Sequence, residues 1–202
     1  DIFELLISPF NPFVYFQLKR LIKRFKPDVV HVHNTWYKLG PSAYFAIKIS
    51  NAKLFQSLHN LRFFCANAFM LRNGNECTKC LDNKIFSIKY SCYKNRVLSA
   101  MSSLHYLIIG KISIFTQSNF YFFSPNYFFD RLIKDLYGLE DANIVKFPNY
   151  VKDFQLIPEE KLNLPTEYLL IVGRNSNEKG LDKFLELWKS LDTDLKLVIA
   201  SP

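Results

Sequence analysis

Short apolar runs alternate along the first sixty residues with segments in which apolar side chains recur every three or four positions. An N-cap at Asn11 is expected to begin a helix over 12–26. The apolar runs at 28–33 and 53–58 are typical of strands, and between them the spacing predicts a helix over 41–50. This order predicts a βαβ unit with parallel strands.

The same alternation continues after an insertion at 60–92 that contains the cysteines. Turn and capping residues mark where each element begins and ends, as they do in the first sixty residues. The further elements expected are a short first strand from Phe3 to Ile7, a long helix around 94–116, a strand at 120–123, a helix from an Asn126 cap to a Gly138 stop, and a strand at 143–147.

Prolines and a loss of periodicity separate this block from the C-terminal part, and we place an interdomain linker at 151–166. Beyond it the pattern predicts a strand at 168–172, an amphipathic helix from Leu181 and a strand at 195–200. The class is therefore α/β, with parallel sheets and helices on both faces. We expect one Rossmann-like domain over 1–150 and the incomplete start of a second over 167–202.

The charge of the chain favours an anionic partner. Its formal net charge is +8 and its pI is about 9.2, which suits nucleic acid, an acidic membrane surface or a phosphate-bearing small molecule. The basic residues of helix 12–26 make either a solvated face or a face for membrane or anion contact. No apolar run is long enough to span a membrane, and no signal peptide is evident, so we expect a cytoplasmic protein, at most peripheral on the inner face of the cytoplasmic membrane.

Four cysteines form the symmetric pattern Cys-x11-Cys-x2-Cys-x11-Cys at Cys65, Cys77, Cys80 and Cys92. Four thiolates at such spacing suit a closed tetrahedral zinc site that pins the insertion and takes no part in catalysis. Two disulfides, an iron–sulfur cluster and unliganded thiols are the alternatives. Zinc ligands in a basic protein also raise a second function class, a zinc-stabilised nucleic-acid-binding module.

A glycine and two cations follow the strand at 168–172. Gly173 allows a tight turn, Arg174 offers a planar fork for phosphate, and Lys179 adds a compact charge near the start of the next helix. In open parallel sheets the binding crevice lies at the carboxyl ends of the strands, where helix N-termini attract anions. The three residues are a candidate pyrophosphate clamp, with solvated loop charges as the alternative.

The stretch "LLIVGRNSNEKGLDKFLELW" resembles the start of the C-terminal domain in glycosyltransferase family 4. Upstream, "KPDVVHVHNTW" and "LGPSAYFAIK" resemble a strand and the following helix of the family's N-terminal domain. "LHNLRFFCANAFMLRNGNECTKC" looks like the cysteine-bearing insertion of one branch, and "FFSPNYFFDRLIKDLYGLEDANIVKFPNYV" looks like the crossover to the second domain. The likeness covers nearly the whole chain in the family's order.

This resemblance implies a GT-B architecture, with an acceptor bound mainly by the first domain and a nucleotide-sugar donor mainly by the second. It implies a retaining glycosyltransferase without a catalytic metal, acting on a glycan or lipid-linked acceptor in cell-surface polysaccharide biosynthesis. Arg174 and Lys179 match the family's diphosphate contacts, so they would stabilise the departing diphosphate. Nucleic acid is then not an expected partner.

The resemblance also singles out His59, which matches the family's histidine near the transferred sugar and is the candidate catalytic residue. Asn60 stands where the family often has an aspartate. We interpret His33 and Asn149 as lining the cleft, and we place His31 on the opposite side of its strand in a structural role, an arrangement that would argue against a two-histidine metal site.

Parts of the family pattern fall outside the chain. The glycine-rich loop would precede Asp1 and the paired donor-binding glutamates would follow Pro202, so we expect a truncated copy that is inactive alone. The donor sugar and base, the acceptor and the oligomeric state stay open.

Overall fold

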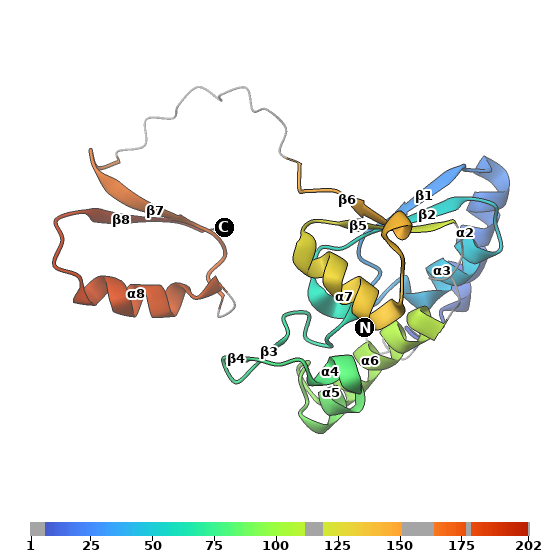
Figure 1. Ribbon diagram of the computed structural model, residues 1–202, viewed down its shortest axis with the longest axis horizontal. Helices are drawn as coiled ribbons and strands as arrows, with labels where there is room; N and C mark the ends of the chain where they lie inside the picture. Colours follow the sequence, from blue (N-terminus) through green and yellow to red (C-terminus); the bar gives the residue numbers. More distant parts are fainter. Residues whose placement is uncertain (1–6, 112–118, 151–163, 177–178, 202) are drawn as a thin grey trace. The chain divides into compact units, whose positions relative to one another are not determined.

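The computed structural model describes residues 7–111, 119–150, 164–176 and 179–201. The chain divides into two compact units, 1–150 and 151–202, each described here by itself (Figure 1). The expected strand from Phe3 to Ile7 falls mainly outside the described residues, and Ile7 itself lies in a turn. The expected linker also falls mainly outside them.

The first unit is built on a four-stranded parallel sheet. Its strands lie in the order β1 (Val29–Val32), β2 (Lys53–Ser57), β5 (Phe120–Ser124) and β6 (Ile144–Lys146). Each of these strands was predicted from the alternation of apolar runs and helices. Because all three pairings are parallel, every strand in the sheet ends at the same edge, and the α/β class is confirmed.

Helix α2 (Pro12–Phe25) begins and ends where local chemistry predicts. The side chain of Asn11 accepts hydrogen bonds from the backbone N–H groups of Phe13 and Val14, and Pro12 occupies the first turn. At the other end Lys26 adopts a left-handed conformation, and its N–H donates to the Ile22 carbonyl. Helix α2 packs on α3 (Gly40–Lys48), which leaves much of its basic face in solvent.

One face of the sheet carries the core. Val32, Leu54, Phe120 and Phe122 are buried on that face, together with side chains from α3, from α6 (Arg96–Lys111) and from α7 (Tyr127–Tyr137). Figure 1 shows these three helices along one side of the sheet. The opposite face presents a row of half-buried side chains that includes Phe55 and Tyr121, so the described core lies on one side of the sheet.

A single residue sets each end of helix α7. The side chain of Asn126 caps α7, and Gly138 ends that helix in a left-handed conformation, as predicted. A 3-10 turn, η3 (Asp141–Asn143), then leads into β6. Helix α6 ends at Lys111 among the described residues, and the remainder of the predicted helix 94–116 lies outside them.

The cysteine-bearing insertion folds into small elements. The 3-10 turn η1 (Leu61–Phe63) is followed by the hairpin strands β3 (Leu71–Arg72) and β4 (Asn75–Glu76), and then by helices α4 (Lys79–Asp82) and α5 (Ile85–Lys89). The hairpin turns through Asn73 and Gly74, both at positive φ, which is the conformation that an Asn-Gly turn favours.

The first residues of the insertion contribute to the core of the first unit. Phe63, Phe64, Cys65 and Met70 belong to the core cluster of the first unit. The backbone carbonyls of Phe63 and Phe64 accept hydrogen bonds from the Lys84 ammonium at 3.2 and 2.5 Å. The insertion is therefore attached to the main core through its first residues.

The second unit contains a parallel strand pair and a helix. Strand β7 (Tyr168–Val172) pairs with β8 (Lys196–Ala200) in register over five residues, and α8 (Leu181–Ser190) connects them. Leu181 is buried, and the rings of Phe184 and Trp188 stack at a centroid distance of 5.9 Å. This βαβ arrangement is the one predicted for the start of a second Rossmann-like domain.

Candidate active site at the carboxyl edge of the sheet

Two predicted site residues meet where adjacent strands end. His33 follows β1 and His59 follows β2, and because these strands are parallel neighbours both side chains lie at the carboxyl edge. His33 Nδ1 and His59 Nε2 are 2.7 Å apart, and their rings are nearly parallel. A hydrogen bond between two imidazole nitrogens needs one donor and one acceptor, so at least one of the rings is neutral.

His31 lies on the same side of β1 as His33, so the opposite placement predicted from the sequence is wrong. Residues two apart in a strand share a face, because successive side chains alternate. The ring centroids of His31 and His33 are 4.2 Å apart, and His31 Nε2 lies 2.8 Å from Ser57 Oγ. Three of the four histidines in the chain therefore gather at this edge.

A buried glutamine fixes the backbone beneath the histidines. Gln56 Nε2 donates to the His33 carbonyl at 2.5 Å and to the Ser57 carbonyl at 2.7 Å, while its side-chain oxygen accepts from the Tyr44 hydroxyl. Gln56 is fully buried among apolar residues. The sequence analysis missed this residue, although a polar residue at an inward position of a strand is a signal that could have found it.

The surroundings of His59 and His31 favour the neutral form of these two side chains. Burial lowers the pKa of His59 below its usual 6.5, and the neighbouring His33 lowers it further. Burial also lowers the pKa of His31, and both His33 and His59 add to that effect. A neutral imidazole can accept one hydrogen bond and donate another, which suits recognition of hydroxyl groups at neutral pH.

A cavity of about 360 Å³ opens beside the three histidines. Phe123, Phe147 and Tyr150 supply aromatic walls, and Asn149 also lies in its lining. The rings of Phe123 and Phe147 stack at 4.8 Å, and the Phe147 N–H donates to the Ser124 carbonyl. No carboxylate occurs among the described residues that line this cavity, and their polar side-chain groups are three imidazoles, the hydroxyls of Ser57 and Tyr150, and an amide.

Asn60 has a local role in the structure. Its side-chain oxygen accepts from the Arg62 N–H at 3.0 Å and so caps η1, while its backbone is extended. An asparagine supplies this capping oxygen as an aspartate would, but without a negative charge. The substitution therefore keeps the turn and removes a carboxylate from beside His59.

The second unit holds the predicted diphosphate clamp at its own strand ends. The Gly173 N–H donates to the Ala200 carbonyl at 3.0 Å, which extends the β7–β8 pairing by one residue. Arg174 and Lys179 are both exposed, and Lys179 directly precedes Gly180, the N-cap of α8. The two cations therefore flank the loop between a strand's carboxyl end and a helix N-terminus, where anions are favoured.

The four cysteines occupy neighbouring parts of the insertion. Cys80 donates a hydrogen bond to the Cys65 sulfur, which lowers the pKa of Cys65 to about 6 and raises that of Cys80. Cys92 lies within electrostatic range of Cys65 and Cys77, and all four thiols are unbridged. Across residues 7–111, 119–150, 164–176 and 179–201, no group of three or more His, Cys, Asp or Glu side chains is arranged to hold a metal ion. Zinc therefore stays a prediction.

Comparison with known proteins supports the predicted family. A family model described as glycosyl transferase 4-like matches residues 5–99, which include β1, α3, β2, all four cysteines and both residues of the His33–His59 pair. Searches among curated proteins and among solved structures gave no significant match. The match over residues 5–99, together with the parallel sheet to which that segment contributes β1 and β2, supports a glycosyltransferase of the family 4-like kind.

Proposed function

We propose that the chain is a retaining glycosyltransferase, or a fragment of one, that transfers a sugar from a nucleotide-sugar to a glycan or lipid-linked acceptor in cell-surface polysaccharide biosynthesis. One observation carries the proposal. The family-matched segment brings His33 and His59 together at the carboxyl edge of a parallel sheet, beside a cavity of about 360 Å³. Ligands of open α/β sheets bind at this edge.

The cavity has the chemistry that a sugar requires. Its imidazoles, the Ser57 hydroxyl and the Asn149 amide offer both donors and acceptors for hydroxyl groups. Phe123, Phe147 and Tyr150 offer apolar surfaces for the C–H faces of a pyranose ring. Its volume falls within the range of about 300–1,000 Å³ that is common for small-molecule sites.

His59 is the proposed residue closest to the reaction. A neutral His59 would hydrogen-bond the sugar and orient it, and His33 would fix the ring through the 2.7 Å contact. The lowered pKa of His59 keeps the imidazole uncharged at pH 7, so it would not repel the cationic charge that develops on the sugar as the glycosidic bond breaks.

The departing diphosphate would be stabilised by the second unit. Gly173 permits close approach of the backbone, Arg174 supplies a forked donor, and Lys179 supplies a point charge beside the N-terminus of α8. These groups would supply electrostatic stabilisation of the leaving group, the contribution that preorganised cations and helix dipoles make in phosphate sites.

Thermal unfolding in the presence of UDP or GDP tests this assignment. At roughly 100-fold excess over Kd, a ligand that binds only the folded state stabilises it by about 2.7 kcal/mol. The variant Arg174→Ala/Lys179→Ala should lose this stabilisation, while Lys183→Ala/Lys189→Ala, which removes two exposed cations of α8, should keep it.

Two outcomes would contradict the proposal. One is equal stabilisation of both variants, which would mean that Arg174 and Lys179 do not bind the diphosphate. The other is salt-sensitive retention on DNA without any response to UDP or GDP, which is the behaviour of the alternative, a nucleic-acid-binding module. The parallel sheet and the family match favour the transferase over that alternative.

We further propose that the four cysteines hold a structural zinc ion. The hydrogen bond between Cys80 and Cys65, and the electrostatic effect of Cys65 and Cys77 on Cys92, support this proposal, because thiolates are soft ligands that suit zinc. A closed thiolate site would stabilise the insertion and leave no coordination position for a substrate. Zinc content of the purified protein, compared with that of Cys77→Ser, measures this directly.

A further inference from the structure

A basic cavity of the first unit lies at the edge opposite the candidate active site. Its volume is about 800 Å³, and it is lined by the residues that precede β1, β2 and β5 and by the ends of α2 and α3. The candidate active site lies where the same strands end. A strand of four or five residues is about 13–17 Å long, so the two cavities are separate sites.

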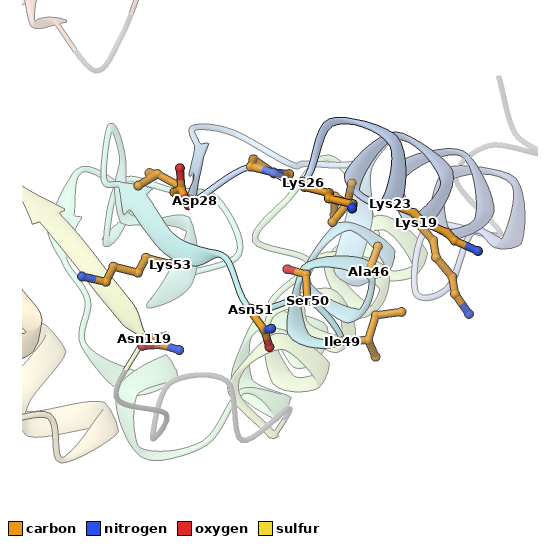
Figure 2. Close-up of a pocket in the computed structure, with 13 residues that line it drawn as sticks. Lys19, Lys23, Lys26, Asp28, Ala46, Ile49, Ser50, Asn51, Lys53 and Asn119 are labelled. Atoms are coloured by element: carbon orange, nitrogen blue, oxygen red, sulfur yellow. The ribbon is translucent and has the colours of Figure 1, made fainter.

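The amino-edge cavity is cationic. Lys19, Lys23 and Lys26 come from α2 and its C-cap, and Lys53 comes from the start of β2. Asp28 is the one carboxylate among the described residues of the lining. Figure 2 shows Lys19 and Lys23 extending from α2 on the side where Ile49 lies. Among the described residues, none of the four lysines forms an ion pair with a carboxylate.

Neutralisation of helix dipoles does not account for this many lysines. The C-termini of α2 and α3 meet at the cavity and together carry about one negative charge. Asp28 adds a second negative charge. Four ammonium groups exceed both, which leaves about two uncompensated positive charges around the cavity.

The floor of the cavity is apolar. Ile22, Val29, Ala46 and Ile49 line it, and Val29 and Ile49 are 50% and 57% exposed. Contact with this apolar surface does not stabilise the binding of a small hydrated anion. A phosphate group attached to a hydrocarbon would contact the lysines with its charge and the apolar side chains with its hydrocarbon part. The lining therefore fits an anionic amphiphile.

The exposed face of α2 indicates that the anionic amphiphile belongs to a membrane. Phe13 and Phe16 are 67% and 64% exposed, and they share their side of the helix with Arg20 and Arg24. Helix α2 contains no acidic residue. Exposed aromatic rings among cations are typical of helices that lie in a membrane interface. No helix within the described part of the chain has the length and apolar character to cross a bilayer.

We propose that the cavity between α2, α3 and the amino ends of β1 and β2 binds the headgroup of an anionic phospholipid, and that α2 thereby docks the first unit on a membrane surface. Lys19, Lys23 and Lys26 contact the headgroup phosphate, Lys53 adds positive charge at the other side of the cavity, and Phe13 and Phe16 enter the interface. This inference does not depend on the transferase assignment, because it uses the opposite edge of the sheet.

Vesicle cosedimentation of the full chain tests the proposal. The probes are phosphatidylcholine vesicles and vesicles of phosphatidylcholine and phosphatidylglycerol in equal amounts. We expect binding to the second kind only. Each lysine near an anionic surface contributes about 1 kcal/mol, so Lys19→Gln/Lys23→Gln should weaken binding about 30-fold. The matched variant Lys183→Gln/Lys189→Gln loses the same charge from α8 and should bind nearly as well as the wild type.

A second variant separates insertion from charge attraction. Phe13→Ser/Phe16→Ser keeps every cation and should weaken binding at least about tenfold, because two exposed rings no longer enter the interface. Equal losses in the two lysine variants would overturn the proposal, since binding would then follow net charge alone. Stabilisation by sodium phosphate without any binding to vesicles would overturn it as well, because the site would then take a soluble anion.

Discussion

Protonation of a buried histidine should make the first unit sensitive to acid. His105 is fully buried on α6, and neither ring nitrogen has a hydrogen-bond partner among the described residues. Its ring packs edge-to-face on Trp36 at a centroid distance of 5.1 Å and lies against Tyr106 at 4.6 Å. Burial, and secondarily the Arg62 charge, lowers its pKa from 6.5 to about 3.

The sign of the effect follows from proton binding in the two states. Below pH 6.5 His105 becomes protonated in the unfolded chain, whereas in the folded chain it stays neutral until the pH approaches 3. The free energy of unfolding therefore falls as the pH is lowered from 6.5 towards 3. Between pH 7.5 and pH 5.0 the loss due to this group amounts to about 2 kcal/mol, and it approaches about 5 kcal/mol when the full shift is expressed.

The assay compares the wild-type chain with His105→Leu, which has a similar volume and no titrating group. Both are made in a Trp188→Phe background, so that Trp36 alone reports unfolding of the first unit. Urea unfolding at pH 7.5 and 5.0 gives the free energy of unfolding of each protein. The wild type should lose about 2 kcal/mol more than the variant. An equal loss in both proteins would refute the reasoning, because other groups would then carry all of the acid sensitivity.

Three further predictions concern stability. Gly40→Ala should destabilise the first unit by more than the cost of about 1–2 kcal/mol for a left-handed non-glycine residue, since its Cβ would meet the Ser8 carbonyl oxygen at 2.3 Å. Gly74→Ala, also at positive φ but with open space around it, should show only the smaller cost in the same urea titration. Asn126→Ala should lower the free energy of unfolding by about 1 kcal/mol, because α7 loses its cap; an unchanged midpoint would contradict this. If the zinc proposal holds, chelation should lower the melting temperature of the wild type and leave that of Cys77→Ser unchanged.

The order of elements was predictable because each depends on local chemistry. The strands of the first sheet, β7, α8 and the helix boundaries at Asn11, Asn126 and Gly138 follow from periodicity and capping, which a single sequence displays directly. The contacts within the insertion were not predictable in this way. Phe63 and Phe64 join the main core through the tertiary fold, and nothing in the spacing of the cysteines reports that.

The candidate site was predicted in part. His33, His59 and Asn149 were chosen from strand ends and from the family resemblance, and the structure brings all three to one cavity. The prediction that His31 and His33 lie on opposite sides of the strand was wrong. Side chains alternate between the two faces, so residues two apart lie on the same face. Tyr150 was missed because it enters the cavity from the loop after β6, a placement that only the fold determines.

The most direct test of the central claim is the NMR spectrum of the histidine rings during titration with UDP-glucose and GDP-mannose. The chain contains four histidines, three at the carboxyl edge and His105 in the core. Single substitutions assign the four signals. The account predicts that His31, His33 and His59 shift with one of the two donors while His105 does not. The account would be contradicted if the signals of His31, His33 and His59 did not shift at a donor concentration that stabilises the protein.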